Sequence, residues 1–141
     1  MNMNLEDRNN YLKGIVLLNI RLNEMSSKRY GMIKDIGSIL GFSDHHIEEA
    51  FSRITETKFK YAEPPKFSHV LFAEAFLRDS IKIAMADDNL QLNELKRLWN
   101  IASLNSLSKQ WLYWELENYF DQSEKLSTAS YEIKNFVVQK N

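Results

Sequence analysis

Glycine and proline are scarce in this sequence and unevenly placed. The four glycines are Gly14, Gly31, Gly37 and Gly41, and the two prolines are adjacent, at 64 and 65. A β-sandwich or β-barrel needs many tight turns, which are usually glycine-rich. A chain of 141 residues without glycine after position 41 therefore favours helices joined by turns of Asn, Asp and Ser. We predict an all-α fold.

Apolar residues recur at helical spacing along the chain. One such stripe, with spacings of three, one and three residues, consists of Ile47, Ala50, Phe51 and Ile54. This is the periodicity of an amphipathic helix rather than of a strand. The seven predicted helices lie near 5–23, 27–40, 44–60, 68–87, 92–104, 109–121 and 129–139. Ser43 and Ser108 stand at predicted helix starts, where a serine hydroxyl accepts a hydrogen bond from a first-turn amide.

Length and charge indicate one domain without a nucleic-acid-binding face. A length of 141 residues is typical of a single domain, which we predict over 1–141. Eighteen basic and nineteen acidic residues leave a formal charge of −1, whereas a general nucleic-acid binder normally has a basic face. The lack of cysteine excludes thiolate zinc sites and cysteine nucleophiles. Without a signal-peptide pattern or an apolar run of about 18 residues, we expect a cytoplasmic protein and no membrane insertion.

The predicted helix 68–87 is apolar on nearly every side. Its polar residues form a narrow strip, chiefly Glu74, Arg78, Asp79 and Lys82. A helix of this kind is expected at the centre of a bundle. Pro64 and Pro65 cannot continue a helix, so we predict that the segment 61–67 is the linker before it.

The sequence also carries a weak internal repeat. A shift of 65 residues aligns 12–51 with 77–116 without a gap. Only four positions are identical, but apolar residues pair along the alignment, as Ile33 does with Leu98. Any two helical segments share a periodicity, yet three helices and both turns stay in register here, which favours a duplicated three-helix unit. The predicted parts are half-repeats at about 11–60 and 68–121 and a cap helix at about 129–139.

The turn between the predicted helices 68–87 and 92–104 carries a motif. Residues 84–98 read Ala-Met-Ala-Asp-Asp-Asn-Leu-Gln-Leu-Asn-Glu-Leu-Lys-Arg-Leu. This stretch resembles the signature of the TerB-like tellurite-resistance family, in which Ala-Asp-Gly is followed by a variable residue, an apolar residue, Ser, two variable residues and Glu. The resemblance is sharpest over 76–116 and extends through the repeat over 11–120. It implies an all-helical fold and a link to tellurite or other stress responses.

The sequence departs from that signature at two positions. Asp88 stands in place of the glycine, which adopts left-handed backbone angles most freely, and Gln91 stands in place of the serine cap. Glu94 keeps the third position of the helix, from which a carboxylate bonds back to the cap amide. The acidic motif is absent from the first half-repeat, where Arg29 occupies the position that matches Glu94.

The same turn is a candidate cation site. Asp87, Asp88 and Glu94 offer the carboxylate oxygens that calcium and magnesium prefer. The spacing differs from that of an EF-hand loop, which has oxygen ligands at alternate positions and a closing Glu at its twelfth residue. In the alternative interpretation, Asp87 and Glu94 cap helices and complement the positive end of the helix 92–104. We expect no cofactor other than such an ion.

The predicted helix 109–121 is rich in aromatic residues. Its predicted inward stripe consists of Leu112, Leu116, Tyr119 and Phe120. Trp111 and Trp114 are three residues apart and therefore neighbours on another face, and Tyr113 lies beside them. We interpret these three residues as a surface for a protein partner. In the alternative, the tryptophans lie beneath the cap helix 129–139.

No pattern of catalytic residues is present. The phosphate-binding glycine motifs and the Gly-x-Ser-x-Gly motif are missing. The densest group of transition-metal ligands is His45, His46, Glu48 and Glu49, but the polar first turn of a helix accounts for it. We therefore expect a non-enzymatic accessory or binding module that acts through protein contacts or a bound cation. The alternative is a generic helical scaffold or homodimer with neither an ion nor a stress role.

Overall fold

The computed structural model describes residues 1–20, 25–55, 63–87 and 90–137. These residues form seven α-helices and two short 3₁₀ helices and contain no β-strand, so the predicted all-α class is confirmed. The α-helices are α1 (Leu5–Asn19), α2 (Ser27–Ile39), α3 (Asp44–Thr55), α4 (Val70–Ala84), α5 (Leu92–Leu104), α6 (Lys109–Asp121) and α7 (Ser123–Thr128). The 3₁₀ helices are η2 (Met85–Asp87) and η3 (Glu132–Phe136).

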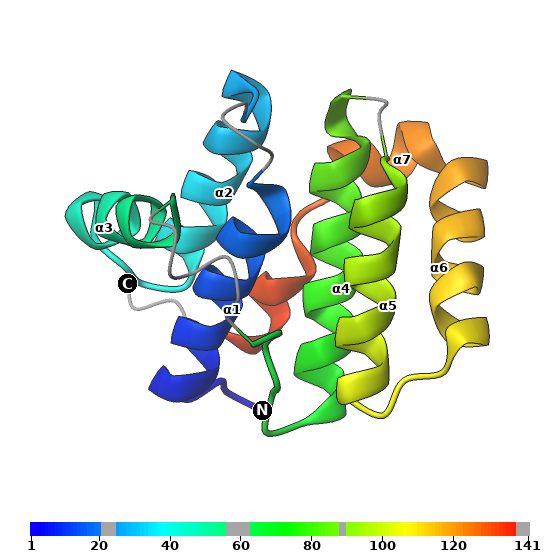
Figure 1. Cartoon of the computed structure of the whole chain (residues 1–141), viewed down its shortest axis with the longest axis horizontal. Coiled ribbons are helices and arrows are strands. Elements are labelled where there is room, and N and C mark those ends of the chain that lie inside the picture. The colour runs from blue at the N-terminus through cyan, green and yellow to red at the C-terminus, as the bar shows by residue number, and fades with distance from the viewer. Residues whose placement is uncertain (21–24, 56–62, 88–89, 138–141) are drawn as a thin grey trace.

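The helices form two groups that meet at the centre of the molecule. Figure 1 shows α1, α2 and α3 on one side and α4, α5 and α6 on the other, and α1 packs against α4 between them. Side chains from both groups and from η3 form one hydrophobic core, which includes Tyr11, Phe76 and Ile133. The chain is therefore a single-domain helical bundle.

The helix α4 lies at the centre of this bundle, as its composition predicts. It contacts α1, α2, α5, α6 and η3, and eleven of its fifteen residues are buried. One of these is Asp79, which the sequence places on the polar strip of the helix. Full burial of a large apolar side chain contributes about 1.5–3 kcal/mol, so α4 supplies a large share of the free energy of folding.

Serine hydroxyls cap the N-terminal ends of α2, α3 and α6. Ser26, Ser43 and Ser108 each accept a hydrogen bond from the amide three residues later, at 3.1, 3.2 and 3.0 Å. Each bond satisfies an amide that has no partner within its helix. The predicted caps at Ser43 and Ser108 are confirmed.

The turns after α2 and after α5 have the same construction. Among the described residues, Gly41 and Ser106 are the two with a left-handed backbone, with φ of 93° and 63°. In each turn the amide of the next residue donates to a carbonyl five positions earlier, that of Gly37 (3.0 Å) or of Ala102 (2.8 Å). This is the Schellman pattern of helix termination, in which glycine avoids the strain that other residues meet at positive φ.

The helix bounds repeat with the offset that the sequence predicts. Adding 65 to the bounds of α1 and α2 gives those of α4 and α5, and α3 and α6 begin at Asp44 and Lys109, which are also 65 apart. The same offset separates Gly41 from Ser106. The superposition of two three-helix units in space stays a prediction.

The structure corrects two helix bounds in the core. α1 ends at Asn19 rather than at 23, because the backbone of Ile20 is extended. α4 begins at Val70 rather than at 68, and its last predicted turn is the 3₁₀ helix η2. Parts of the predicted helices 5–23 and 44–60 and of the predicted linker 61–67 fall outside the described residues.

The predicted cap helix 129–139 is wrong. The chain instead forms α7 directly after α6, becomes extended at Ala129 and continues into η3. The amides of Glu132 and Ile133 donate to the carboxylate of Asp79 on α4, at 2.7 and 3.1 Å. These long-range hydrogen bonds hold the start of η3 against α4. The buried side chain of Ile133 then packs η3 into the core.

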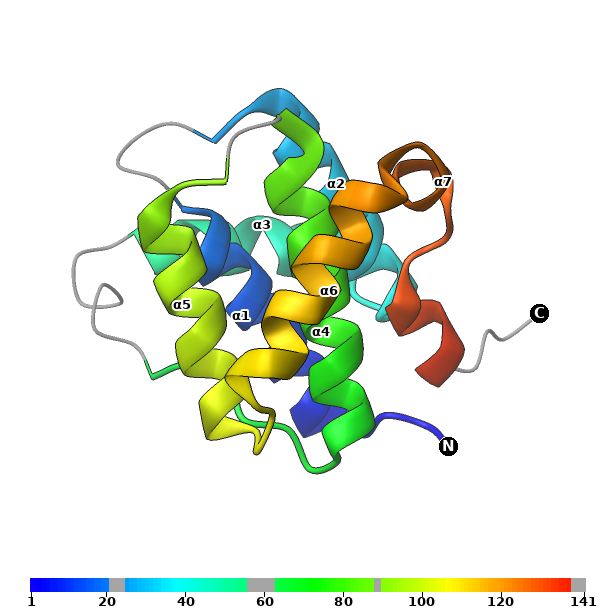
Figure 2. The same cartoon turned by 90° about the vertical axis from the view of Figure 1, so that its right-hand side faces the viewer.

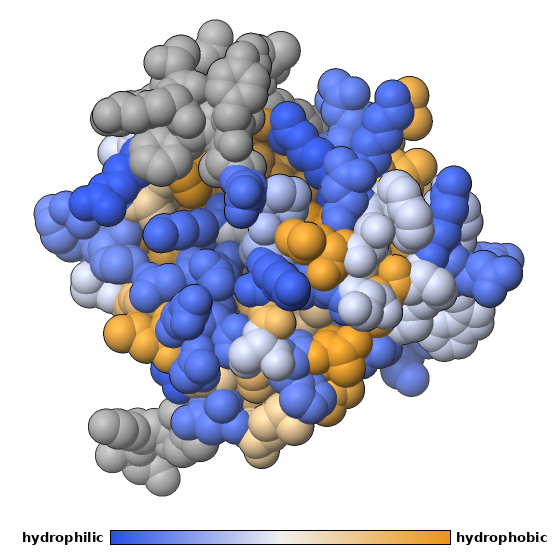
Figure 3. Space-filling view, turned by 60° about the horizontal axis from the view of Figure 1, so that its bottom comes forward, coloured by the Kyte–Doolittle hydropathy of each residue, from blue (hydrophilic) through white to orange (hydrophobic). Residues whose placement is uncertain are grey.

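Within the described residues, we find no helix that is both long and apolar enough to span a bilayer. On the face drawn in Figure 3, hydrophobic residues are visible as small separate areas among hydrophilic ones. Scattered apolar residues of this kind are normal on the surface of a folded domain and need no functional explanation.

Candidate functional site

The side chain of Arg29, on α2, is buried where the two groups of helices meet, with 2 % of its surface exposed. Its Nη1 lies 3.0 Å from Glu94 Oε2 and 3.3 Å from Asn19 Oδ1. Its Nη2 donates to the carbonyl oxygen of Ala84 at 2.7 Å, and its Nε lies 3.1 Å from Asp87 Oδ2. One guanidinium thus joins α2 to the end of α1 and to the turn between α4 and α5.

The two carboxylates around Arg29 also bond to the starts of helices. Ser26, the cap of α2, donates its hydroxyl proton to Asp87 Oδ2 at 2.7 Å. The amide of Gln91 donates to Glu94 Oε1 at 3.3 Å, which confirms the predicted capping role of Glu94. A buried charge without a partner costs several kcal/mol. The acidic turn therefore supplies the counter-charges of a buried cation.

This arrangement bears on the predicted cation site. Asp87 and Glu94 are brought together, but the positive group between them is the guanidinium of Arg29. Asp88 lies outside the described residues. Among the residues that are described, no three His, Cys, Asp or Glu side chains gather closely enough to hold a metal ion. Binding of calcium or magnesium at this turn stays a prediction, and such an ion would compete with Arg29.

The side of α6 that is turned away from the bundle carries large aromatic side chains. Trp114 is 60 % exposed, Phe120 58 % and Tyr113 47 %, and we call these three residues the α6 face. Figure 2 shows α6 in front of the other helices, with its outer side at the surface. Lys109 Nζ lies 5.6 Å from the ring centre of Tyr113 and 5.8 Å from that of Trp99, so a cation borders the face next to α5.

The predicted inward stripe of α6 is right at three positions and wrong at Phe120. Leu112, Leu116 and Tyr119 are buried, whereas Phe120 is exposed. Seven residues make about two helical turns, so Phe120 lies on the same side of α6 as Tyr113. The exposed surface of the helix is therefore more aromatic than the sequence alone indicates.

Trp111 and Trp114 have different surroundings, although the sequence groups them together. Trp111 is only partly exposed, and Cζ of Arg78 lies 5.7 Å from its ring centre. Arg78 Nε and Nη2 donate to Glu115 Oε1 at 3.1 and 2.8 Å, and this bond raises the pKa of Arg78 above its usual value. Trp111 therefore belongs to the packing between α4 and α6, while Trp114 is open to a partner.

Asp79, on α4, is a buried carboxylate that holds three elements together. It accepts hydrogen bonds from the hydroxyl of Tyr11 (2.6 Å) and from the amides of Glu132 and Ile133. Burial raises the pKa of Asp79 to about 6, although the hydrogen bonds act in the opposite direction. The carboxylate therefore ties α1 and η3 to α4, and it titrates near neutral pH.

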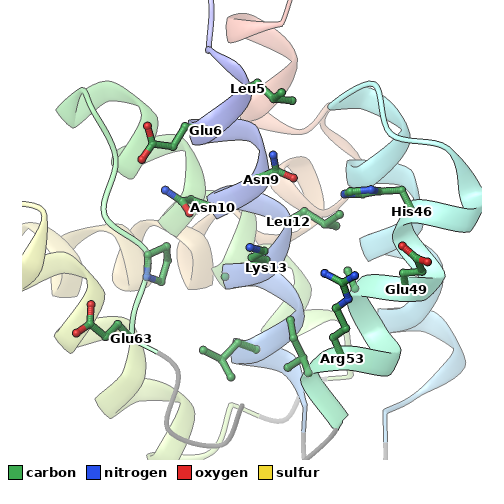
Figure 4. Close-up of a pocket in the computed structure, with 15 residues that line it drawn as sticks. Leu5, Glu6, Asn9, Asn10, Leu12, Lys13, His46, Glu49, Arg53 and Glu63 are labelled. Carbon is green, nitrogen blue, oxygen red and sulfur yellow. The ribbon is translucent and has the colours of Figure 1, made fainter. Parts of the chain in front are cut away.

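A cavity of about 710 Å³ lies between α1, α3 and the segment 63–65; Figure 4 shows the side chains that line it. Its apolar lining includes Leu12, Gly14, Leu17, Ala50, Ile54 and Pro65. Its charged lining consists of Glu6, Lys13, Glu49, Arg53 and Glu63. A volume of this size is within the range of about 300–1,000 Å³ that is typical of small-molecule sites.

The four His and Glu residues at the start of α3 make separate contacts. His45 Nε2 lies 3.3 Å from Glu49 Oε1, and both side chains are largely exposed. The ring of His46 stacks on the ring of Phe42, with 4.4 Å between the centroids. Glu48 accepts a hydrogen bond from the hydroxyl of Tyr30, which lowers the pKa of Glu48. These contacts fit the interpretation that the group is the polar first turn of a helix.

Comparisons with known proteins add no relative to this picture. No protein-family model matches the chain, and no curated protein and no solved structure matches it. The kinship with TerB-like proteins stays a prediction that rests on residues 84–98.

Proposed function

We propose that this chain is a non-enzymatic binding module that contacts a protein partner through the α6 face. The observation that carries the proposal is the joint exposure of Tyr113, Trp114 and Phe120 on one helix. Exposed aromatic groups of this size are a common sign of an interaction site. Tryptophan and tyrosine also contribute a disproportionate share of binding energy when a partner buries them.

The corresponding surface of α3 shows that the fold itself does not require aromatic residues there. The positions 65 residues before Tyr113 and Trp114 are Glu48 and Glu49, and both are exposed. Acidic residues at exposed helical positions are well hydrated and stay in water at no cost. The contrast with α3 supports a role that is specific to α6, and partner binding is the role that fits exposed aromatic side chains.

We further propose that the module serves a tellurite or other stress response, on the strength of the TerB-like motif at 84–98. Cation binding is left out of the proposal, because Asp87 and Glu94 already hold the guanidinium of Arg29. Deletion of the gene, followed by growth on tellurite, tests the stress link. Unchanged growth would remove that part of the proposal and leave the binding role in place.

The test of the binding role compares a double variant of the α6 face with a matched control. Tyr113→Ser with Trp114→Ser removes two exposed aromatic groups, and Leu5→Ser removes one exposed apolar side chain on α1. Purified wild type and variants, checked for an unchanged melting temperature, are immobilised and exposed to extract from cells that express the chain. A protein retained by wild type and Leu5→Ser but lost with the double variant would support the proposal.

Sedimentation velocity separates this proposal from the homodimer alternative. A partner in the extract predicts that the purified chain is monomeric and that the double variant sediments unchanged. A dimer that the double variant dissociates would show that the α6 face binds a second copy instead. Equal retention of the same proteins by wild type and the double variant would contradict any binding role for this face.

A further inference from the structure

The crossing of α4 with α6 is closed by an ion pair and an indole ring. Arg78 on α4 bonds to Glu115 on α6, and Trp111 covers the guanidinium. What is left between these helices and the C-terminal segment is a small cavity of about 110 Å³. This crossing is therefore filled by its own side chains.

The crossing of α1 with α3 has a cation at the position of Arg78 but no carboxylate at the position of Glu115. Lys13 is the ninth residue of α1, as Arg78 is of α4. Ala50 is the seventh residue of α3, where α6 has Glu115. A methyl group thus replaces the carboxylate, and the space between the helices is the cavity of about 710 Å³.

Two cations stand over this cavity, and neither forms an ion pair within the part of the chain that the structure describes. Lys13 comes from α1 and Arg53 from α3, and among the described residues no carboxylate lies within ion-pair distance of either. Figure 4 shows Glu6 and Glu63 on the other side of α1 from Arg53, with Lys13 between them. Two of the three rim carboxylates are therefore separated from Arg53, whereas the third, Glu49, lies on α3 beside it.

The remaining acids of the rim limit the charge that a ligand carries. Glu49 lies one helical turn from Arg53, and its Oε1 lies 3.3 Å from His45 Nε2. Together with Glu6 and Glu63, it gives the rim three carboxylates, which repel a dianion such as a phosphate monoester more strongly than a single carboxylate. Beneath the charges, the floor is apolar and accepts a hydrocarbon body.

We propose that the cavity between α1 and α3 binds an amphiphile with one carboxylate head and an unbranched apolar chain, such as a medium-chain fatty acid. The head pairs with Lys13 and Arg53, in the role that Glu115 has for Arg78 in the other crossing. The chain lies against the floor formed by Leu12, Leu17 and Ile54. The ligand thus replaces a side chain that this half of the molecule lacks.

The first test compares three ligands of equal chain length below their micelle concentrations. Decanoate, decanol and decyltrimethylammonium are titrated into the whole protein by calorimetry, and backbone amide NMR shifts locate the binding. We expect decanoate to bind at least tenfold more tightly than the other two and to shift amides of α1 and α3. Absence of binding, equal binding of all three, or shifts confined to other helices would overturn the proposal.

The second test uses variants. Lys13→Met keeps the length and apolar stem of the side chain, and we expect it to lower decanoate affinity at least tenfold, to the level of decanol. Lys96→Met, at an exposed position of α5, is the matched control and should bind as wild type does. Ala50→Glu supplies the missing carboxylate within the chain and should abolish binding.

A melting curve confirms that each variant is folded before titration. If Ala50→Glu does not fold, Lys13→Met still decides the matter. Wild-type decanoate affinity in Lys13→Met would overturn the proposed pairing of the head group.

Discussion

The two groups of helices share their order and all but one of their bounds, at an offset of 65 residues, but carry complementary residues where they meet. Arg29 in the first group bonds to Glu94 in the second, and these positions are 65 apart. Tyr11 and Phe76, also 65 apart, pack edge to face with 5.2 Å between ring centroids. The lesson is that residues 65 positions apart meet at the centre of the molecule, where two identical charges would repel each other.

Loss of the buried cation should have the largest effect on stability. Arg29→Met removes the guanidinium that balances the buried charge of Glu94, so we expect the free energy of unfolding to fall by about 3–5 kcal/mol. Urea denaturation measures it. Lys34→Met, which breaks the surface pair with Glu48, is the control and should cost far less, because exposed ion pairs contribute little to stability.

A double variant sharpens this first prediction. Arg29→Met combined with Glu94→Met replaces the pair by apolar side chains, and we expect it to be more stable than Arg29→Met alone. Equal losses in Arg29→Met and Lys34→Met would show that the two groups do not depend on this contact.

The buried carboxylate of the second group should make stability depend on pH. The pKa of Asp79 is about 6 in the folded protein and 3.8 when it is unperturbed. Because the folded pKa is raised, the stabilising contribution is complete below about pH 4 and is lost as pH rises through 6. We expect the difference in unfolding free energy between wild type and Asp79→Asn to fall by about 2 kcal/mol from pH 4 to pH 7.

Chemical denaturation at four pH values between 4 and 7 provides this measurement. The Asn side chain does not titrate, so groups other than Asp79 cancel in the difference. Parallel curves for the two proteins would contradict the raised pKa.

A methyl group at the crossing of α1 with α4 should be destabilising. A Cβ at Gly14 would lie 2.6 Å from Pro65 Cγ and 2.9 Å from Phe76 Cε2. We expect Gly14→Ala to lower the unfolding free energy by about 1–3 kcal/mol. Gly31→Ala is the control, since nothing lies within 4 Å of its Cβ, and a helical alanine there should raise stability by up to about 1 kcal/mol. Denaturation curves that rank the two variants the other way would refute the close packing.

The smallest effect should come from the paired turns after α2 and α5. Ser106 adopts the left-handed backbone that Gly41 adopts in the other turn. Ser106→Gly should therefore raise the unfolding free energy by about 1 kcal/mol, and Gly41→Ser should lower it by a similar amount. Melting temperatures of the two variants test the pair, and shifts of the same sign would show that the turns are not equivalent.

Much of the fold could be predicted from the sequence because it depends on local signals. Ser43 and Ser108 mark helix starts through their hydroxyls, and the helices they begin have the predicted starts. The C-terminal segment was predicted wrongly for a long-range reason. Its apolar spacing is helical, but the carboxylate of Asp79, more than fifty residues earlier, binds the amides of Glu132 and Ile133.

The candidate sites were less accessible to prediction because they depend on which positions meet. The sequence places Arg29 at the position that matches Glu94. On sequence alone this difference indicates the loss of an acidic motif, whereas in the structure the two residues form an ion pair. The cavity between α1 and α3 is lined by residues from three separate segments, Ala50 among them, so no local sequence pattern predicts it. The difference between Ala50 on α3 and Glu115 on α6 becomes meaningful only when the positions of the helices are known. The sequence places Phe120 in the core wrongly, because helical spacing does not show which side of an apolar stripe packs against other helices.

The guanidinium of Arg29 finds both of its carboxylates on the opposite group of helices. If each group were expressed as a separate fragment, the first would contain Arg29 without these carboxylates, and the second would contain the carboxylates without Arg29. Two such fragments should stay largely unstructured apart and regain helicity when mixed, so that fragment complementation rather than independent folding is the natural behaviour of this architecture.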